Sequence, residues 1–287
     1  ITNHKFFLNL AFQMAEKNLG KTGHNPSVGS IIVKNNTVIS SGVTSINGRP
    51  HAEFNALNKV KNAIGSTLYT SLEPCIHQGK TPPCTDIIIK KKIKKVFFGF
   101  EDPDLRTFKK AKKILNTKGI KSKLIKSKKY NNFYRSYLIN KQFKIPFISA
   151  KIAISKDYFT INKKEKWITN IFSRRITHLL RSRHDGIIST SKSINCDNAL
   201  LNCRIEGLNK YKPDLFIIDL NLKLKKNLLL NKILKKRKTY LITYKTNIKK
   251  AQIYKKKGYR IIFVNSLNNK NDFNLLFKKI YKMGYSR

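Results

Sequence analysis

The residues best suited to chemistry in this sequence are one histidine, one glutamate and two cysteines. His51 and Glu53 stand two positions apart in the run HAE, and Cys75 and Cys84 bound the later run CIHQGKTPPC. Imidazole nitrogens and thiolates are zinc ligands, and a catalytic zinc site leaves one position for water. Bound zinc lowers the pKa of that water, so hydroxide is available near neutral pH. The pattern therefore predicts a catalytic zinc centre, with Glu53 beside it as the group that moves protons.

A long loop separates the two cysteines. Zinc deaminases of nucleobases carry these cysteines as C-x-x-C, whereas eight residues stand between Cys75 and Cys84 here. Polar residues, a glycine and Pro82-Pro83 fill the loop, which disfavours a regular helix or strand. We expect this loop to wrap a substrate beside the metal. Two other interpretations are a closed structural zinc site, with His77 as the fourth ligand, and free thiols in a core. The catalytic interpretation is favoured because the cysteine loop occurs in one chain with HAE and with a further motif at residues 25–29.

The chain is strongly basic, with 60 Lys and Arg against 15 Asp and Glu and a net charge of +45. Such a charge is typical of nucleic-acid-binding proteins. However, Lys, Asn and Ile are abundant throughout, and AT-rich codons encode all three. No aromatic-interleaved RNA-binding motif accompanies the charge. We therefore attribute it to mutational bias and expect no nucleic-acid partner, although the positive field would attract a phosphorylated substrate.

Length, cysteine content and hydropathy narrow the class of protein. A chain of 287 residues is long enough for two domains. Four cysteines do not suggest a disulfide scaffold, and we expect Cys196 and Cys203 to stay reduced. No apolar run approaches the roughly 20 residues that span a bilayer, and the first residues predict a helix rather than a signal peptide. We expect a cytoplasmic protein without a membrane partner.

The elements that must position the chemical residues alternate between helix and strand over the first half. Apolar spacing predicts a sheet with helices on its faces: helices over 5–18, 51–60, 85–91 and 106–117, and strands over 28–33, 37–41, 67–71 and 96–100. Asn35-Asn36 predicts a hairpin between the first two strands. The stretch 130–144 is expected to be a closing helix or a linker. Both zinc-site cysteines fall at strand-to-helix junctions, where helix N-termini favour thiolate.

A second pattern begins near Pro146, where we expect a domain boundary. The spacing of apolar residues predicts helices over 173–183 and 272–283 and strands over 147–154, 185–190, 214–219, 239–243 and 259–264. We therefore expect a second α/β domain.

One further motif, Asn25-Pro26-Ser27-Val28-Gly29, lies upstream of HAE and the long cysteine loop. Together these motifs resemble the bifunctional deaminase/reductase family of riboflavin biosynthesis. The resemblance implies an α/β chain with two domains. The first, over 1–145, would be a cytidine-deaminase-like three-layer α/β/α domain that uses one Zn2+. The second, over 146–287, would be a dihydrofolate-reductase-like α/β domain.

The reaction implied by the resemblance is hydrolytic deamination of 2,5-diamino-6-(5-phosphoribosylamino)pyrimidin-4(3H)-one, a small phosphorylated pyrimidine. His51, Cys75 and Cys84 would hold zinc, and Glu53 would be catalytic. The residues that would hold the ring and phosphate are Asn25, His77, Lys80, Thr81 and Asp102. Asp104 departs from the family, which has asparagine at this position.

The second half resembles the family's reductase domain, which uses NADPH to reduce the ribosyl group to ribityl. Ordered pieces such as Lys151-Ile152-Ala153 and Trp167-Ile168-Thr169 carry this resemblance. The residues implied to contact NADPH are Ala153, Trp167, Ser193 and Asp197. Arg181 and Arg204 would contact substrate phosphate or sugar, because guanidinium binds two oxygens at once. Each residue alone also fits a core or a solvated surface, so the ordered set carries the assignment.

The chain ends at Tyr285-Ser286-Arg287, before the Gly-rich loop that cradles cofactor phosphates in the family. We therefore expect a C-terminally short reductase domain, in a fragment or in a protein whose reductase has decayed, and no NADPH oxidation by this chain alone. The alternatives are a deaminase-only enzyme, a nucleoside or tRNA base deaminase, and a basic nucleic-acid-binding protein that keeps a deaminase fold. The long cysteine loop argues against the base deaminase. A homo-oligomer is compatible with the sequence.

Overall fold

The computed structural model describes residues 3–160, 167–209 and 213–287. The chain divides into two units, one comprising the residues up to Phe147 together with Ser286, and the other comprising Ile148–Tyr285 and Arg287. The expected boundary between residues 145 and 146 lies two residues before this division. Each unit has its own sheet and its own core. We describe them separately.

The first unit is built on a five-stranded sheet of order β2-β1-β3-β4-β5. β1 pairs antiparallel with β2 and β3, whereas β3, β4 and β5 run parallel. Its strands are β1 (Gly29–Lys34), β2 (Thr37–Val43), β3 (Thr67–Thr70), β4 (Lys95–Phe98) and β5 (Lys121–Leu124). Its helices are α1 (His4–Glu16), η1 (Ile46–Gly48), α2 (Ala52–Leu57), α3 (Cys84–Lys90), α4 (Ala111–Thr117) and α5 (Lys128–Phe143).

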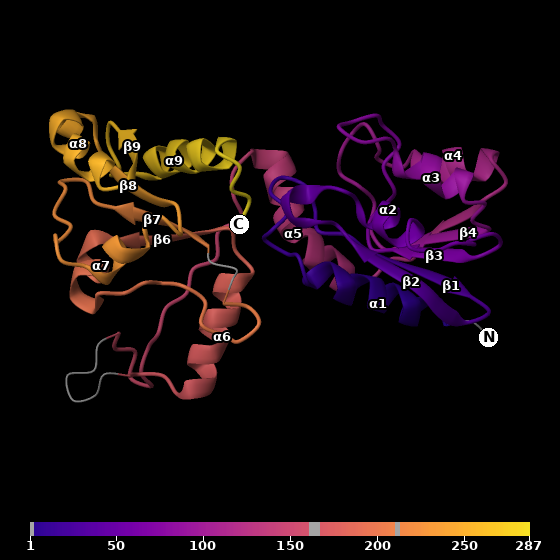
Figure 1. The fold of residues 1–287 in the computed structure, drawn as a ribbon, viewed down its shortest axis with the longest axis horizontal. Coiled ribbons are helices and arrows are strands. Elements are labelled where there is room, and N and C mark those ends of the chain that lie inside the picture. Colours follow the sequence, from indigo (N-terminus) through magenta and orange to yellow (C-terminus); the bar gives the residue numbers. More distant parts are fainter. Residues whose placement is uncertain (1–2, 161–166, 210–212) are drawn as a thin grey trace. The chain divides into compact units, whose positions relative to one another are not determined.

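Helices cover both faces of this sheet, with α1 on one face and α2, α3 and α4 on the other (Figure 1). One core joins α1 and α5 to the sheet through aromatic side chains such as Phe12, Tyr69 and Tyr134. The other core joins α2, α3 and α4 to the opposite face through Ile32, Leu68 and Val96. Because helices cover both faces of the sheet, side chains that point to either face from β1 are buried, which explains why β1 is apolar along most of its length. The expected three-layer α/β/α arrangement is confirmed.

Two glycines let the helices approach the sheet closely. A Cβ at Gly29 would lie 1.9 Å from the carbonyl oxygen of Ala11 in α1. A Cβ at Gly42 would lie 2.3 Å from the carbonyl oxygen of Ala52 in α2. The glycine of the sequence motif NPSVG is therefore required for packing of α1 on β1.

The second unit is built on a four-stranded, all-parallel sheet of order β6-β7-β8-β9. One core includes Ile194 of α7 (Ser191–Asp197), with Tyr254 of α8 (Ile248–Lys256) packed against it, and the other includes Leu276 and Ile280 of α9 (Lys270–Lys282). Its strands are β6 (Gly186–Thr190), β7 (Asp214–Ile218), β8 (Thr239–Tyr244) and β9 (Arg260–Val264). Its helices are α6 (Ile171–Ser182), α7 (Ser191–Asp197), η2 (Leu229–Ile233), η3 (Lys245–Asn247), α8 (Ile248–Lys256) and α9 (Lys270–Lys282).

The structure corrects several element predictions. No strand forms over residues 147–154, where Ile148, Ile152 and Ile154 remain 50%, 69% and 41% exposed. β-Branched residues favour a strand only where a partner strand pairs with them, and none does so in the described part of the chain. The helix expected over 106–117 begins at Ala111, because Lys109 adopts a left-handed φ of 58°. β5, α7 and α8 were not expected. No helix among the described residues has the length and apolar character to cross a membrane.

Candidate active site

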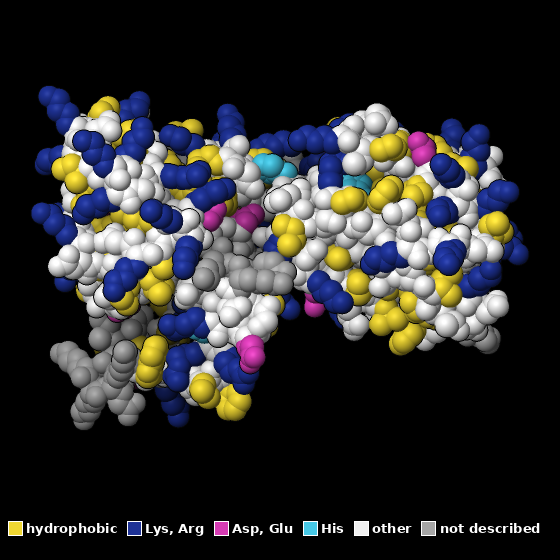
Figure 2. Space-filling view, in the orientation of Figure 1, with side chains coloured by type: hydrophobic (Ala, Val, Ile, Leu, Met, Phe, Trp, Pro, Cys, Tyr) yellow, Lys and Arg dark blue, Asp and Glu magenta, His cyan; other side chains and the backbone are white. Residues whose placement is uncertain are grey.

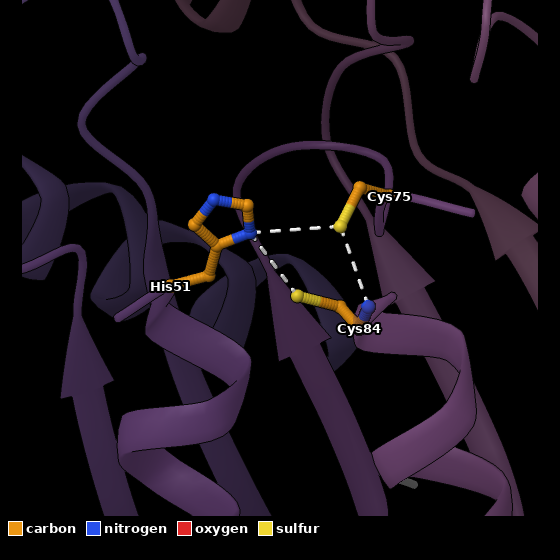
Figure 3. Close-up of side chains that lie close together, drawn as sticks. All are labelled: His51, Cys75 and Cys84. Atoms are coloured by element: carbon orange, nitrogen blue, oxygen red, sulfur yellow. Dashed lines mark hydrogen bonds between the residues drawn. The ribbon is translucent and has the colours of Figure 1, made fainter. Parts of the chain in front are cut away.

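The zinc-ligand candidates come together at three element ends. His51 directly precedes α2, Cys75 lies in the irregular segment after β3, and Cys84 is the first residue of α3. Nδ1 of His51 lies 3.5 Å from Sγ of Cys75 and 3.4 Å from Sγ of Cys84 (Figure 3). The backbone N–H of Cys84 donates to Sγ of Cys75 over 3.3 Å. Residues 33 positions apart in the chain therefore present their ligand atoms to one point.

These separations fit tetrahedral zinc. Bonds of about 2.0–2.1 Å to nitrogen and about 2.3 Å to sulfur would place the nitrogen and each sulfur roughly 3.5 Å apart. Within the described residues, the group of mutually close ligand atoms comprises His51, Cys75 and Cys84, all within 4.8 Å of one another. His77 is not a member, and its Nδ1 lies 3.2 Å from Oγ1 of Thr107. Three protein ligands suit a catalytic site better than a closed structural one.

Glu53 lies in the first turn of α2, next to this group. Its side chain is buried, and its Oε2 accepts a hydrogen bond from the Cys84 thiol at 3.4 Å. Burial raises the pKa of Glu53 to about 7. The contact with Cys84 is the main cause that lowers the pKa of Cys75 to about 4, and His51 adds to it. The local field thus favours a thiolate at Cys75, whereas the hydrogen bond with Cys75 and burial raise the pKa of the Cys84 thiol. It also favours a carboxyl group at Glu53 that exchanges protons near neutral pH.

A pocket opens over the ligand group. Three of the expected substrate-binding residues, Asn25, His77 and Asp102, line it together with His51 and Glu53. The other two do not line it. Lys80 is exposed on the cysteine loop, and Thr81 accepts a hydrogen bond from Nη1 of Arg49 at 2.6 Å. Thr81 is therefore bonded to a residue that does line the pocket, Arg49.

Sequence reasoning missed several pocket residues. Tyr137 and Lys141 come from α5, one turn apart, and a helical repeat within the aromatic and basic stretch 130–144 was the available signal. Arg106 reaches the pocket beside Asp104, whose carboxylate bonds Arg106 at 2.7 Å and Lys141 at 2.9 Å. Those two cations hold the pKa of Asp104 well below its usual range. Further lining residues that were not anticipated are Arg49, Thr44, Leu72 and Glu73.

In the second unit, the two expected substrate arginines meet around one histidine. Nη1 of Arg181 donates to the carbonyl oxygen of Asn202 at 3.1 Å, and His178 Nδ1 lies 3.1 Å from the same oxygen. The backbone N–H of Arg204 donates to Nδ1 of His178 at 3.3 Å. Burial, followed by the two arginines, lowers the pKa of His178. The arrangement concentrates positive charge beside α6.

The residues expected to contact NADPH occupy several segments of the second unit. Ser193 and Asp197 lie four positions apart on α7, and both are exposed. Trp167 is half-exposed, with the guanidinium carbon of Arg174 4.6 Å from its ring centroid. Ala153 lies in the irregular segment that follows Phe147. Ser193 and Asp197 thus share one helix, whereas Trp167 and Ala153 lie in segments that form neither helix nor strand.

Lys and Arg side chains are scattered over both units on the visible face, between polar and apolar groups (Figure 2). They do not gather into a continuous strip on that face. A scattered distribution is what a compositional bias produces, whereas nucleic-acid binding favours clustered charge.

Two family models match the chain. Residues 1–100 match the cytidine and deoxycytidylate deaminase zinc-binding region. Residues 146–287 match the RibD C-terminal domain. The two matches fall on the two units of the structure.

Curated and solved proteins match nearly the whole chain. The riboflavin biosynthesis protein RibD of Aquifex aeolicus is 33% identical over 93% of this chain and 75% of its own length. The RibD of Actinobacillus pleuropneumoniae is 30% identical over 96% of this chain and 74% of its own length. The structure of Acinetobacter baumannii RibD is 25% identical, covers 98% of this chain and 77% of its own, and superposes with a TM-score of 0.80.

Proposed function

Because this chain belongs to the RibD family of riboflavin biosynthesis proteins, we propose that its first unit deaminates 2,5-diamino-6-(5-phosphoribosylamino)pyrimidin-4(3H)-one by hydrolysis. The product would be 5-amino-6-(5-phosphoribosylamino)uracil. One observation carries this proposal: His51, Cys75 and Cys84 converge within 4.8 Å, and a buried carboxylate stands beside them in a pocket. RibD proteins are deaminase/reductases, and neither a base deaminase nor a nucleic-acid-binding protein is favoured.

Zinc, held by His51, Cys75 and Cys84, would supply a water activated for attack on the ring carbon that bears the amine. Glu53 would carry one proton of that water to the ring nitrogen and then the second to the departing amino group, which leaves as ammonia. The position of Glu53 supports this role. Its Oε2 lies 3.4 Å from the sulfur of Cys84, but Glu53 is not a member of the ligand group of His51, Cys75 and Cys84.

The other pocket residues would hold the substrate. Asn25, His77 and Asp102 offer an amide, an imidazole and a carboxylate to the ring and sugar. Lys80 and Thr81 remain proposals for the phosphate end. Thr81 would act there by orienting Arg49, whose fork can bind two phosphate oxygens. We propose a cytoplasmic location, because all four cysteines are free and zinc needs Cys75 and Cys84 reduced.

Turnover of the zinc-loaded chain tests the deaminase. We expect one ammonia released for each diaminopyrimidine consumed, with about one zinc per chain, and no ammonia from cytidine or from tRNA. Mass spectrometry of the pyrimidine and a coupled ammonia assay measure both sides of the reaction. A chain that carries full zinc and leaves the diaminopyrimidine intact, or that deaminates cytidine instead, would refute the assignment.

The second unit belongs to the reductase half of the family, and NADPH is its cofactor. NADPH, when bound, supplies the hydride that converts the ribosyl group to ribityl. We propose that Ala153, Trp167, Ser193 and Asp197 contact the cofactor. Arg181 and Arg204 would hold the substrate phosphate or sugar, because the two guanidinium groups converge on His178 and Asn202.

Trp167 reports on cofactor binding directly, because it is the only tryptophan in the sequence. NADPH is expected to quench Trp167 emission and to give sensitised nicotinamide emission, with a weaker response in Asp197→Asn. Cys196→Ser, at the neighbouring exposed position of α7, is the matched control and should titrate like wild type. Unchanged Trp167 emission at millimolar NADPH would contradict the proposed contact residues.

A further inference from the structure

Glu73 is a buried carboxylate that the proposed chemistry does not use. It follows β3 and lies two residues before Cys75, and its side chain is only 2% exposed. No Lys or Arg side chain in the described part of the chain forms an ion pair with it. A buried charge without a counter-ion is costly unless hydrogen bonds compensate for it. The neighbours of Glu73 must therefore account for its burial.

Three backbone N–H groups compensate the carboxylate. Oε2 accepts from the N–H of Asp102 at 3.2 Å and from that of Lys109 at 3.1 Å. Oε1 accepts from the N–H of Ala111 at 3.1 Å. Asp102 and Lys109 both lie in the connection between β4 and α4, and Ala111 is the first residue of α4. One side chain thus fastens both ends of residues 102–110 of this connection, which we call the 102–110 loop.

The 102–110 loop supplies one wall of the pocket. Asp102, Asp104 and Arg106 all line the pocket from it. Its Thr107 is buried, and Oγ1 of Thr107 lies 3.2 Å from Nδ1 of His77 on the cysteine loop. Any shift of the 102–110 loop would therefore move Asp102 and release His77 together.

The backbone of the loop depends on an outside support. Lys109 has a left-handed φ of 58°, a conformation that a lysine adopts only where its surroundings hold it. Its N–H is one of the three that Glu73 accepts. The N–H of Ala111 has no acceptor within its own helix, because it belongs to the first turn of α4. Glu73 satisfies both groups with one carboxylate.

We propose that Glu73 is a positioning residue for deamination, which fixes the 102–110 loop so that Asp102 and His77 meet the substrate. The inference rests on the proposed deaminase function. It predicts a loss of substrate binding rather than of zinc chemistry, because the hydrogen bonds of the Glu73 carboxylate within the described part of the chain go to Asp102, Lys109 and Ala111 and not to a zinc-ligand residue. Contacts that act equally on substrate and transition state change KM more than kcat.

The test compares Glu73→Gln with Glu101→Gln in the intact, zinc-loaded chain. Glutamine keeps the side-chain shape but turns an NH2 group toward backbone N–H groups, so one acceptor is lost. Glu101, which follows β4 and directly precedes Asp102 in the chain, is not among the residues that line the pocket and is the matched control. We expect Glu73→Gln to keep full zinc, to raise KM about tenfold and to change kcat by less than about threefold. Glu101→Gln should leave both constants unchanged.

A double-mutant cycle separates positioning from a purely structural role. If Glu73 acts in part through Asp102, the Glu73→Gln/Asp102→Asn double variant should raise KM by clearly less than the product of the two single effects. Independent, multiplying effects on KM, or a wild-type KM in Glu73→Gln despite a lower melting temperature, would overturn the inference. If Glu73→Gln fails to fold, Glu73→Asp carries the same cycle, since it keeps the charge and shortens the reach. Absence of turnover in wild type would count against the proposed function instead.

Discussion

Glu53→Gln is expected to keep one zinc per chain and to lose deaminase turnover by about 10³-fold, within the range that general acid–base catalysis contributes. Glutamine has nearly the shape of glutamate, so the pocket and the ligand group should remain intact. Its amide cannot accept and return a proton, so transfer from water to the leaving ammonia would fail. Zinc content by elemental analysis and kcat by the ammonia assay are the two measurements.

Glu101→Gln removes a carboxylate outside the pocket and should behave like wild type, which separates a specific effect from a change in net charge. A stability effect is not expected at Glu53, because burial already raises the pKa of its carboxyl to about 7 and the neutral amide needs no counter-ion. Turnover by Glu53→Gln within a few-fold of wild type would exclude Glu53 as the proton carrier. Loss of zinc in this variant would instead indicate that Glu53 supports the ligands.

The zinc site was predictable because its signal is local. HAE and the two cysteines are short motifs whose residue types have few other uses in this order, and His51 and Cys84 each stand where a helix begins. The hairpin was predictable for a similar reason, because Asn35 and Asn36 both take left-handed φ values, 50° and 59°, that asparagine tolerates. Family membership, the α/β fold class and the two cofactors, expected from these motifs, are confirmed by the comparisons.

The rest of the pocket has no local signal. Tyr137 and Lys141 reach it from α5, some 60 residues beyond Cys75, through packing of Tyr130 and Tyr134 on α1. Arg49 could not be distinguished from any other basic residue in a chain of 60 Lys and Arg. β5 was missed because two of its four residues are lysines, as an exposed edge strand allows. Tertiary contacts, rather than propensity, decide these positions.

The difference between local sequence pattern and tertiary contact also explains why no strand formed over 147–154. The apolar residues of that segment fit a strand, but strand formation depends on pairing with a neighbour. β6, at the edge of the second sheet, pairs only with β7 among the described residues. Phe147 instead donates its N–H to the carbonyl oxygen of Ser286 at 2.8 Å. The N–H of Phe147 is therefore bonded to Ser286 and not to a neighbouring strand.

Cys84→Ala is expected to lower bound zinc from about one per chain to less than 0.1 and to abolish deamination, a loss of at least about 10³-fold. Cys84 is 3% exposed and supplies one of three ligand atoms, so no neighbouring side chain can replace it. The first unit should also melt earlier by several degrees, because a metal that binds only the folded state stabilises it by roughly 3 kcal/mol at a few hundred times its Kd. Calorimetry of the intact chain measures this shift.

The matched control is Cys196→Ala, which removes an exposed thiol from α7 in the second unit. It should retain zinc, turnover and both melting transitions. The transition of the second unit should also be unchanged in Cys84→Ala, because its two cores share no residue with the cores around the zinc ligands. Retention of full zinc by Cys84→Ala would mean that another side chain, with His77 the first candidate, holds the metal. The site would then be structural and closed, and the catalytic role of Glu53 would fall with it.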